Sequence, residues 1–257
     1  MVYLLEIFML LDEVKATLAM ENLTLNEEQE KLLEQYAEGK CSFEQFQELI
    51  VKLLKENKAA WILEASTFDE AYCYKGTEVL KNNFNERDPR VLSQLERMYT
   101  GARIIDLLKK PLDGNFDIAH LKKIHHYILQ DIYPCAGTIR TVNISKEILF
   151  CDAQYIEKEL NKIFLQLKQE QYLKNCTDKD IAKRAAYYLG EINAIHPFRE
   201  GNGRTQREFI RQLLLPLNYY VDYSKVKPDM MLYASINAFA GDYQLMTQLF
   251  ENCIIKQ

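Results

Sequence analysis

Apolar residues recur at helical spacing along most of the chain, and this pattern predicts an all-α protein. One apolar stripe comprises Phe43, Phe46, Leu49, Ile50, Leu53 and Leu54. A second comprises Ile181, Ala185, Leu189 and Ile192, and predicts a core helix. We expect further helices over residues 90–109, 117–130, 152–170, 178–194, 204–215 and 228–254, the last with a break near Gly241.

Residues 1–56 predict a unit of three helices with acidic and lysine-rich outer faces. Two residue pairs resemble the capping boxes that start helices, namely Asn26 with Gln29 and Ser42 with Gln45. Gly39 lies where the helix between these two starts should stop. After Trp61 aromatic and turn residues become more frequent, so we expect a second unit to begin there.

The first residues of the chain are strongly apolar, from position 2 to position 11. They lack the basic segment and the small-residue cleavage site of a signal peptide, and they are shorter than the ~20 residues that span a bilayer. We therefore expect a buried helix and no membrane partner. Met9 leaves open whether residues 1–8 belong to the natural start.

One segment, residues 138–150, departs from the helical pattern. It is rich in β-branched residues, with turn-prone Asn143, Ser145 and Lys146 inside it, and so predicts a short β-hairpin. The open edge of such a hairpin could bind an extended peptide by strand addition. The alternative is a simple connector packed on the core.

Composition limits the partners of the protein. A net charge of -5 and a pI of about 5.6 argue against a basic nucleic-acid-binding surface, so we expect no direct nucleic-acid partner. The six cysteines contain no Cys-x-x-Cys pair and predict reduced thiols in a cytoplasmic protein. His125 and His126 lack a neighbouring acid or thiol at metal spacing, so we expect them in the core and on the surface of a helix.

Residues 196–207 carry the strongest chemical signal, and read His-Pro-Phe-Arg-Glu-Gly-Asn-Gly-Arg-Thr-Gln-Arg. The backbone N–H groups of Gly201, Asn202 and Gly203 can converge on an anion at the start of the following helix. That helix N-terminus adds a partial positive charge. The segment therefore predicts phosphate chemistry.

The side chains of this segment suggest individual roles. His196 has an ordinary pKa near ~6.5 and can accept a proton from an attacking hydroxyl as general base. Glu200 offers the hard oxygens that suit Mg²⁺. The Asn202 side chain is expected to assist the phosphate-binding turn. Arg204 and Arg207 are one turn apart and are expected to face the same way, toward the outer phosphates.

Three further residues, two inside this segment and one after it, are expected to take no part in the chemistry. Pro197 prevents the preceding helix from continuing. Phe198 is expected to anchor the loop in the core. Arg211, although on the same helix as the two phosphate-binding arginines, is expected on the surface.

The motif resembles the signature of the Fic family (filamentation induced by cAMP). The matching residues are His196, Pro197, Phe198, Glu200, Gly201, Asn202, Gly203 and Arg204, with Arg207 in its extended form. The similarity covers about residues 70–215 and includes a family-like entry string at Tyr74, Gly76, Thr77, Leu80 and Asn82. It implies the Fic fold and transfer of AMP from ATP to a Tyr, Ser or Thr hydroxyl of a target protein, with Mg²⁺ as cofactor and pyrophosphate released.

Residues 136–137 and 140–142 resemble the target-docking flap of this family. The implied flap residues are Thr141, Val142, Asn143, Ile144, Ser145 and Lys146. Cys135 stands where many relatives have Trp, which could loosen packing under the flap. Gly203 stands where phosphorylating relatives of the Doc type carry Lys, and so favours AMP transfer.

Thr17, Glu21 and Asn22 match the family's inhibitory motif. By resemblance, Glu21 pairs with Arg207 and displaces the ATP γ-phosphate. Residues from about 9 to 56 resemble the separate antitoxin of class I Fic toxins, which implies an antitoxin-like inhibitory unit over 1–58 and a Fic domain over 59–257. The alternative is a class II arrangement, in which the inhibitory helix is native to the Fic protein.

The sequence thus favours an autoinhibited adenylyltransferase over two alternatives. One is a bifunctional enzyme in which Glu21 positions water for AMP removal. The other is a non-catalytic, peptide-binding regulatory module. By resemblance alone, type II topoisomerase subunits are the first target candidates, and self-modification is also expected.

Overall fold

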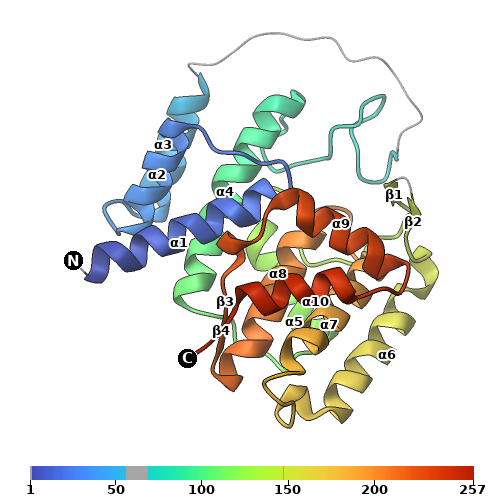
Figure 1. The fold of residues 1–257 in the computed structure, drawn as a ribbon. Helices are drawn as coiled ribbons and strands as arrows, with labels where there is room; N and C mark the ends of the chain where they lie inside the picture. The colour runs from blue at the N-terminus through green and yellow to red at the C-terminus, as the bar shows by residue number, and fades with distance from the viewer. Residues whose placement is uncertain (1, 56–68, 147) are drawn as a thin grey trace.

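The computed structural model describes residues 2–55, 69–146 and 148–257, which are predominantly helical (Figure 1). The N-terminal helices are α1 Val2–Ala19, α2 Glu27–Ala37 and α3 Phe43–Lys55. The remaining α-helices are α4 Pro89–Lys109, α5 Ile118–Leu129, α6 Ile156–Gln169, α7 Ile181–Ile195, α8 Asn202–Leu214, α9 Pro228–Phe239 and α10 Gln244–Cys253. Single 3₁₀ turns are η1 Ala153–Tyr155, η2 Gln171–Leu173, η3 Leu215–Leu217 and η4 Tyr223–Lys225. The predicted all-α class is confirmed.

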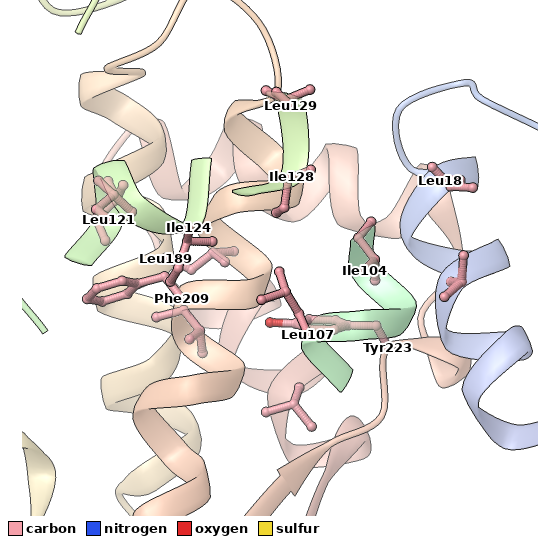
Figure 2. Packing of buried hydrophobic residues seen from close by; sticks show 14 of the residues in the cluster. Leu18, Ile104, Leu107, Leu121, Ile124, Ile128, Leu129, Leu189, Phe209 and Tyr223 are labelled. Carbon is pink, nitrogen blue, oxygen red and sulfur yellow. The ribbon is translucent and has the colours of Figure 1, made fainter. Parts of the chain in front are cut away.

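Helix α8 runs through the centre of the molecule, against α5 and α7. In Figure 2, Leu121, Ile124 and Ile128 of α5 lie in the same packed region as Phe209 of α8, and all four side chains are fully buried. Polar residues of α8 are buried as well, so each needs an internal partner.

Arg211 illustrates this requirement and corrects a sequence-based prediction. Its side chain is 2% exposed, whereas we expected it on the surface. It donates to both carboxylate oxygens of Glu208 and to the Leu107 carbonyl oxygen. The prediction failed because β3 and α5 also pack against α8, leaving it no solvent-facing side there.

Helix α1 packs against α4 and η4, so the N-terminal segment lies directly on the rest of the protein. Its buried face includes Val14 and Leu18, both fully buried. The expectation of a buried helix over residues 2–11 is wrong for the other face, where Phe8 is 66% and Met9 50% exposed. The predicted boundary at 58/59, like Trp61, lies outside the described residues.

Both predicted capping boxes are present at the starts of α2 and α3. The predicted break near Gly241 is also present, because α9 ends at Phe239 and Gly241 has a left-handed φ of +87°. A small sheet that the sequence did not predict joins β3 Tyr219–Val221 to β4 Ile254–Lys256. The last predicted helix therefore ends one residue early, where the chain becomes extended.

The predicted hairpin is present but shorter than expected. Strand β1 is Ser145–Lys146 and pairs in antiparallel register with β2 Ile148–Leu149. Ser145 and Lys146 were expected in the turn, and instead their backbones form the first strand. The strands lie beside the end of α9 in Figure 1.

Candidate active site

His196 caps the C-terminus of α7 in a left-handed conformation, with φ 50° and ψ 63°. Its Nδ1 lies 3.3 Å from the Asn193 carbonyl oxygen, which can only accept a hydrogen bond. This contact assigns the proton of the neutral ring to Nδ1 and leaves Nε2 as the proton acceptor. The ring stacks on Phe150, with centroids 3.9 Å apart and planes at 17°. The His196 ring is thus oriented from two sides.

The loop between α7 and α8 is anchored in the core. Phe198 is 1% exposed, as expected for the anchor, and stacks on His125 at 3.8 Å between centroids. His125 accepts from the Gly137 N–H at Nδ1 and therefore donates from Nε2 to the Glu200 carbonyl oxygen. Burial lowers the pKa of His125 to about 3, so its ring is neutral. The expected placement of His125 in the core and of His126 at the surface is confirmed.

The turn that starts α8 is fitted closely to its neighbours. Gly201 has a φ of +75°, and a Cβ atom there would also collide with Leu129. The Asn202 side chain is 3% exposed and bonds to both the N–H and the carbonyl of Phe198. These two bonds hold the loop, and Asn202 also belongs to the cavity lining, so its help in phosphate binding stays a prediction.

Arg204 and Arg207 do not face the same way. The Arg204 side chain is fully buried and pairs with Glu96 of α4 and with Glu200. Burial by itself would lower the pKa of Arg204, but the charges of Glu96 and Glu200 outweigh it and raise that pKa above its usual value. Arg204 supports Glu200 from inside the core and is absent from the cavity lining, which corrects the expectation that it reaches the outer phosphates.

Glu200 brings a carboxylate to the cavity lining. Its side chain is 34% exposed, and its Oε1 accepts from the Gly201 N–H and from Arg204. Burial and the neighbouring Glu96 raise the pKa of this carboxyl group. Within the described ranges no three His, Cys, Asp or Glu side chains form a metal-binding group. A single carboxylate fits Mg²⁺, which commonly binds through one or two carboxylates plus substrate phosphates.

Arg207 reaches the N-terminal segment. One terminal nitrogen of its guanidinium donates to Glu21 Oε1 at 2.8 Å and to the Thr17 carbonyl oxygen at 3.0 Å. Asn22 adopts a left-handed φ of 58° and ends the turn after α1, as expected. A Cβ atom at residue 203 would collide with Glu21 and crowd Arg207, so glycine allows the carboxylate to approach this closely.

A cavity of about 500 Å³ brings these groups together. One part is lined by Glu21, His196, Glu200, Gly203 and Arg207. It continues between α7 and α9, where apolar side chains dominate the lining. A polar end joined to an apolar chamber is typical of a small-molecule site.

Comparison with known proteins agrees with this geometry. Residues 115–214 match the Fic/DOC family. The probable protein adenylyltransferase y4lH of Sinorhizobium fredii is 40% identical over 176 residues, which cover 68% of this chain and 90% of that protein. The chain belongs to the Fic/DOC family.

Two further relatives extend the comparison. The protein adenylyltransferase VbhT of Bartonella schoenbuchensis is 38% identical over 70% of this Fic chain, a match that spans 38% of VbhT. The crystal structure of BepC from Bartonella tribocorum, with bound AMPPNP, superposes with a TM-score of 0.68 at 29% identity, and covers 74% of this chain and 98% of that one. The predicted family, fold and enzyme class, a protein adenylyltransferase, are thereby confirmed.

The flap of this Fic protein is tied to its surroundings at its base. Ile144 lines the cavity, whereas the Thr141 N–H donates to the Tyr72 hydroxyl and Asn143 bonds to Asp152. Docking of a target by the flap stays a prediction. For the described part of the chain, no helix is long and apolar enough to cross a membrane.

Sequence reasoning missed three residues that hold this Fic site together. Glu96, Arg140 and Phe150 contact Arg204 or His196 from distant segments. Arg140 lies in a stretch that the resemblance singled out, but its contacts follow from no local pattern. Glu96 lies inside a long helix and carries no sequence signal of its own.

Proposed function

We propose that this protein is an autoinhibited protein adenylyltransferase, which transfers AMP from ATP to a hydroxyl group of a target protein. The relatives named protein adenylyltransferases support the reaction. The observation that carries the autoinhibition is the ion pair between Glu21 and Arg207, which faces the same cavity as His196. Both side chains of the pair are shielded, at 18% and 5% exposure.

In the proposed reaction, the target hydroxyl oxygen forms a bond to the α-phosphorus of ATP. The bond from that phosphorus to the bridging oxygen breaks, and pyrophosphate leaves with the electron pair. His196 Nε2 takes the hydroxyl proton, because Nδ1 already carries one. The first N–H groups of α8, from Asn202 onward, would bind the phosphates, because the Gly201 N–H already donates to Glu200 Oε1. Glu200 would hold Mg²⁺, which supplies charge neutralisation for the phosphate oxygens.

Glu21 blocks this reaction by competition for Arg207. A carboxylate and a terminal phosphate are both anions suited to the same guanidinium fork. Because Glu21 belongs to the same chain, its effective concentration at Arg207 is high, and even a modest pair keeps the site closed.

Removal of Glu21 tests the proposal. The Glu21→Gly protein, incubated with α-labelled ATP and Mg²⁺, is expected to label itself or a lysate protein far more strongly than the wild type does. The Glu21→Gly/His196→Ala double variant should be silent. As a matched control, Glu34→Gly makes the same substitution at an exposed residue of α2 and should label no better than the wild type.

Two outcomes would contradict the proposal. If the Glu21→Gly protein binds ATP but gives no label, it is not an adenylyltransferase under these conditions, and the proposed activity is contradicted. Equal labelling by the wild type and Glu21→Gly would remove the autoinhibition. Purified type II topoisomerase subunits are the first targets to include, and intact mass would report one added AMP.

A further inference from the structure

Arg140 is a buried arginine whose side chain bonds to main-chain carbonyl oxygens in the described structure. It is 1% exposed and lies just before the flap. Its guanidinium donates to four carbonyl oxygens, those of Val142, Cys151, Ile195 and His196. A buried charge is costly unless hydrogen bonds compensate it, and here polar oxygens surround the guanidinium.

The four oxygens come from the segments that must meet for catalysis. Val142 and Cys151 flank the flap hairpin, and their oxygens lie 2.7 and 2.5 Å from the guanidinium. Ile195 and His196 end α7, and their oxygens lie at 3.2 and 2.8 Å. The Arg140 backbone N–H also donates to the Pro197 carbonyl oxygen at 2.9 Å. One residue therefore joins both ends of the flap to the catalytic loop.

These contacts constrain His196 in two ways. Its left-handed backbone turns the carbonyl away from the helix, where Arg140 Nε binds it. Its ring stacks on Phe150, the residue before Cys151, which the same guanidinium holds. The positive charge also lies at the C-terminal end of α7, where the helix dipole favours a cation.

We propose that Arg140 is a positioning residue for adenylyl transfer, which fixes the catalytic base and the flap relative to each other. This inference rests on the proposed function. Arg140 does not line the cavity, so it acts on His196 and the flap rather than on the nucleotide. Correct placement of reacting groups can be worth orders of magnitude in rate, and displacements of about 1 Å can cost ~100-fold.

The test uses Arg140→Lys and Arg140→Met in the full chain, with Glu21→Gly present to release the site. Lysine keeps the charge but cannot place donors on four oxygens at once. We expect kcat to fall about 10–100-fold in both variants. We expect the dissociation constant for ATP, measured by calorimetry, to change less than about threefold, because the cavity lining is intact.

Arg184→Met is the matched control. Arg184 lies near the other end of α7 and pairs with Glu170, so its loss removes a shielded arginine without touching the site. It should lower the melting temperature while leaving kcat within about twofold of the Glu21→Gly parent.

The histidine ring signals give a readout that does not need turnover. The chain has four histidines, and His196→Ala assigns the signal of the base. In Arg140→Lys, we expect the His196 ring nitrogen signals to move, while those of His120 stay in place. Unchanged His196 signals, or unchanged kcat in a folded Arg140→Met protein, would overturn the inference. An inactive Glu21→Gly parent would instead contradict the proposed function and leave the nuclear resonance test of Arg140 standing.

Discussion

The two sides of the candidate site are held in different ways. On the core side, Arg204 is fully buried between Glu96 and Glu200, and Glu96 also accepts from the Tyr133 hydroxyl at 2.5 Å. On the N-terminal side, Arg207 is held by Glu21, whose side chain is 18% exposed, and by one main-chain oxygen. Arg204 and Arg207 are only three residues apart on α8, yet their partners belong to different parts of the molecule.

This contrast bears on which side of the site would move under the proposed function. Loss of the Arg204 network would leave buried charges without partners, so that side changes only if the core unfolds. Under the proposed function, α1 is a cover: it would separate from α8 and leave Arg207 facing the cavity, while the loop between α7 and α8 stays fixed.

The largest effect is expected from breaking the buried ion pairs of Arg204 on the core side of the site. Glu96→Ala removes the main partner of Arg204 and the acceptor of the Tyr133 hydroxyl. Breaking a buried ion pair by removing one partner typically costs about 3–5 kcal/mol, because the other charge stays buried. We expect the free energy of unfolding, measured by urea denaturation, to fall by this order, and activity to be lost with it.

Glu27→Ala is the control for this effect. Glu27 pairs with Lys31 on the exposed face of α2. Surface pairs of this kind contribute little, so its loss should leave the unfolding midpoint unchanged within error. A Glu96→Ala protein as stable as Glu27→Ala would show that the core side of the site is not the fixed one.

The next largest effect is expected from weakening the packing of α1 against the core without changing a residue of the site. Leu18 of α1 is fully buried, and its Cδ1 would lie 3.4 Å from a Cβ atom at Gly101 of α4. A buried Leu→Ala substitution costs about 2–5 kcal/mol, and here the loss falls on the packing of α1 against the core. We therefore expect Leu18→Ala to raise adenylylation activity at least ~10-fold over wild type.

Leu121→Ala separates release of the cover from general destabilisation. Leu121 is equally buried, but it lies on α5 in the core. Its loss should lower the melting temperature by a similar amount and leave activity at or below the wild-type level. Equal activation by both variants would mean that α1 is not a separable cover.

Local sequence patterns were sufficient to predict many of the helices and the loop that carries the site. The apolar stripes predicted the helices, and the 196–207 motif predicted the loop, each from a few neighbouring residues. The pairing of Glu21 with Arg207 was implied only by the resemblance of a short N-terminal string to the family's inhibitory motif. All four residues of the predicted α7 stripe are buried, although the buried surface of that helix extends beyond the stripe.

Local spacing could not predict which distant segment packs against each side of a helix. Arg204 and Arg211 point into the core because their hydrogen-bond acceptors lie on α4, about a hundred residues away in sequence. The acceptor for Arg204 is Glu96, and the acceptor for Arg211 is the Leu107 carbonyl oxygen. Pairing of β3 with β4 likewise joins distant segments. The contacts of Arg140 depend on how the flap and α7 meet.

A smaller effect is expected from pH, through Glu13 on the buried face of α1. Glu13 is 3% exposed and accepts from the Tyr220 hydroxyl at 2.9 Å and from the Tyr223 N–H at 3.1 Å. Burial raises the pKa of Glu13 from 4.5 to about 7. The other charged or titratable groups that act on it are Asp222 and Arg211, with Cys253 nearby on α10.

The sign of the pH effect follows from this shift. Because the docked state has the higher pKa, docking is strongest when Glu13 is protonated and weakens as pH rises through about 7. Between pH 6 and 8 the docking constant should fall roughly tenfold. The measurement is wild-type activity divided by Glu21→Gly activity at each pH, which cancels the titration of the catalytic base. That ratio should rise with pH and should be flat in Glu13→Gln, whereas a ratio that falls would contradict the sign.

The smallest effect is expected at Thr17, although the inhibitory motif includes it. Its hydrogen bond to Arg207 uses the main-chain oxygen, which every residue type provides. Thr17→Val keeps the shape and the β-branch of this 6% exposed side chain and removes only the hydroxyl. We expect labelling within about twofold of wild type, because one hydroxyl that does not contact Arg207 contributes little to docking. Activation approaching that of Glu21→Gly would show that the hydroxyl, and not only the backbone around it, holds α1 on the site.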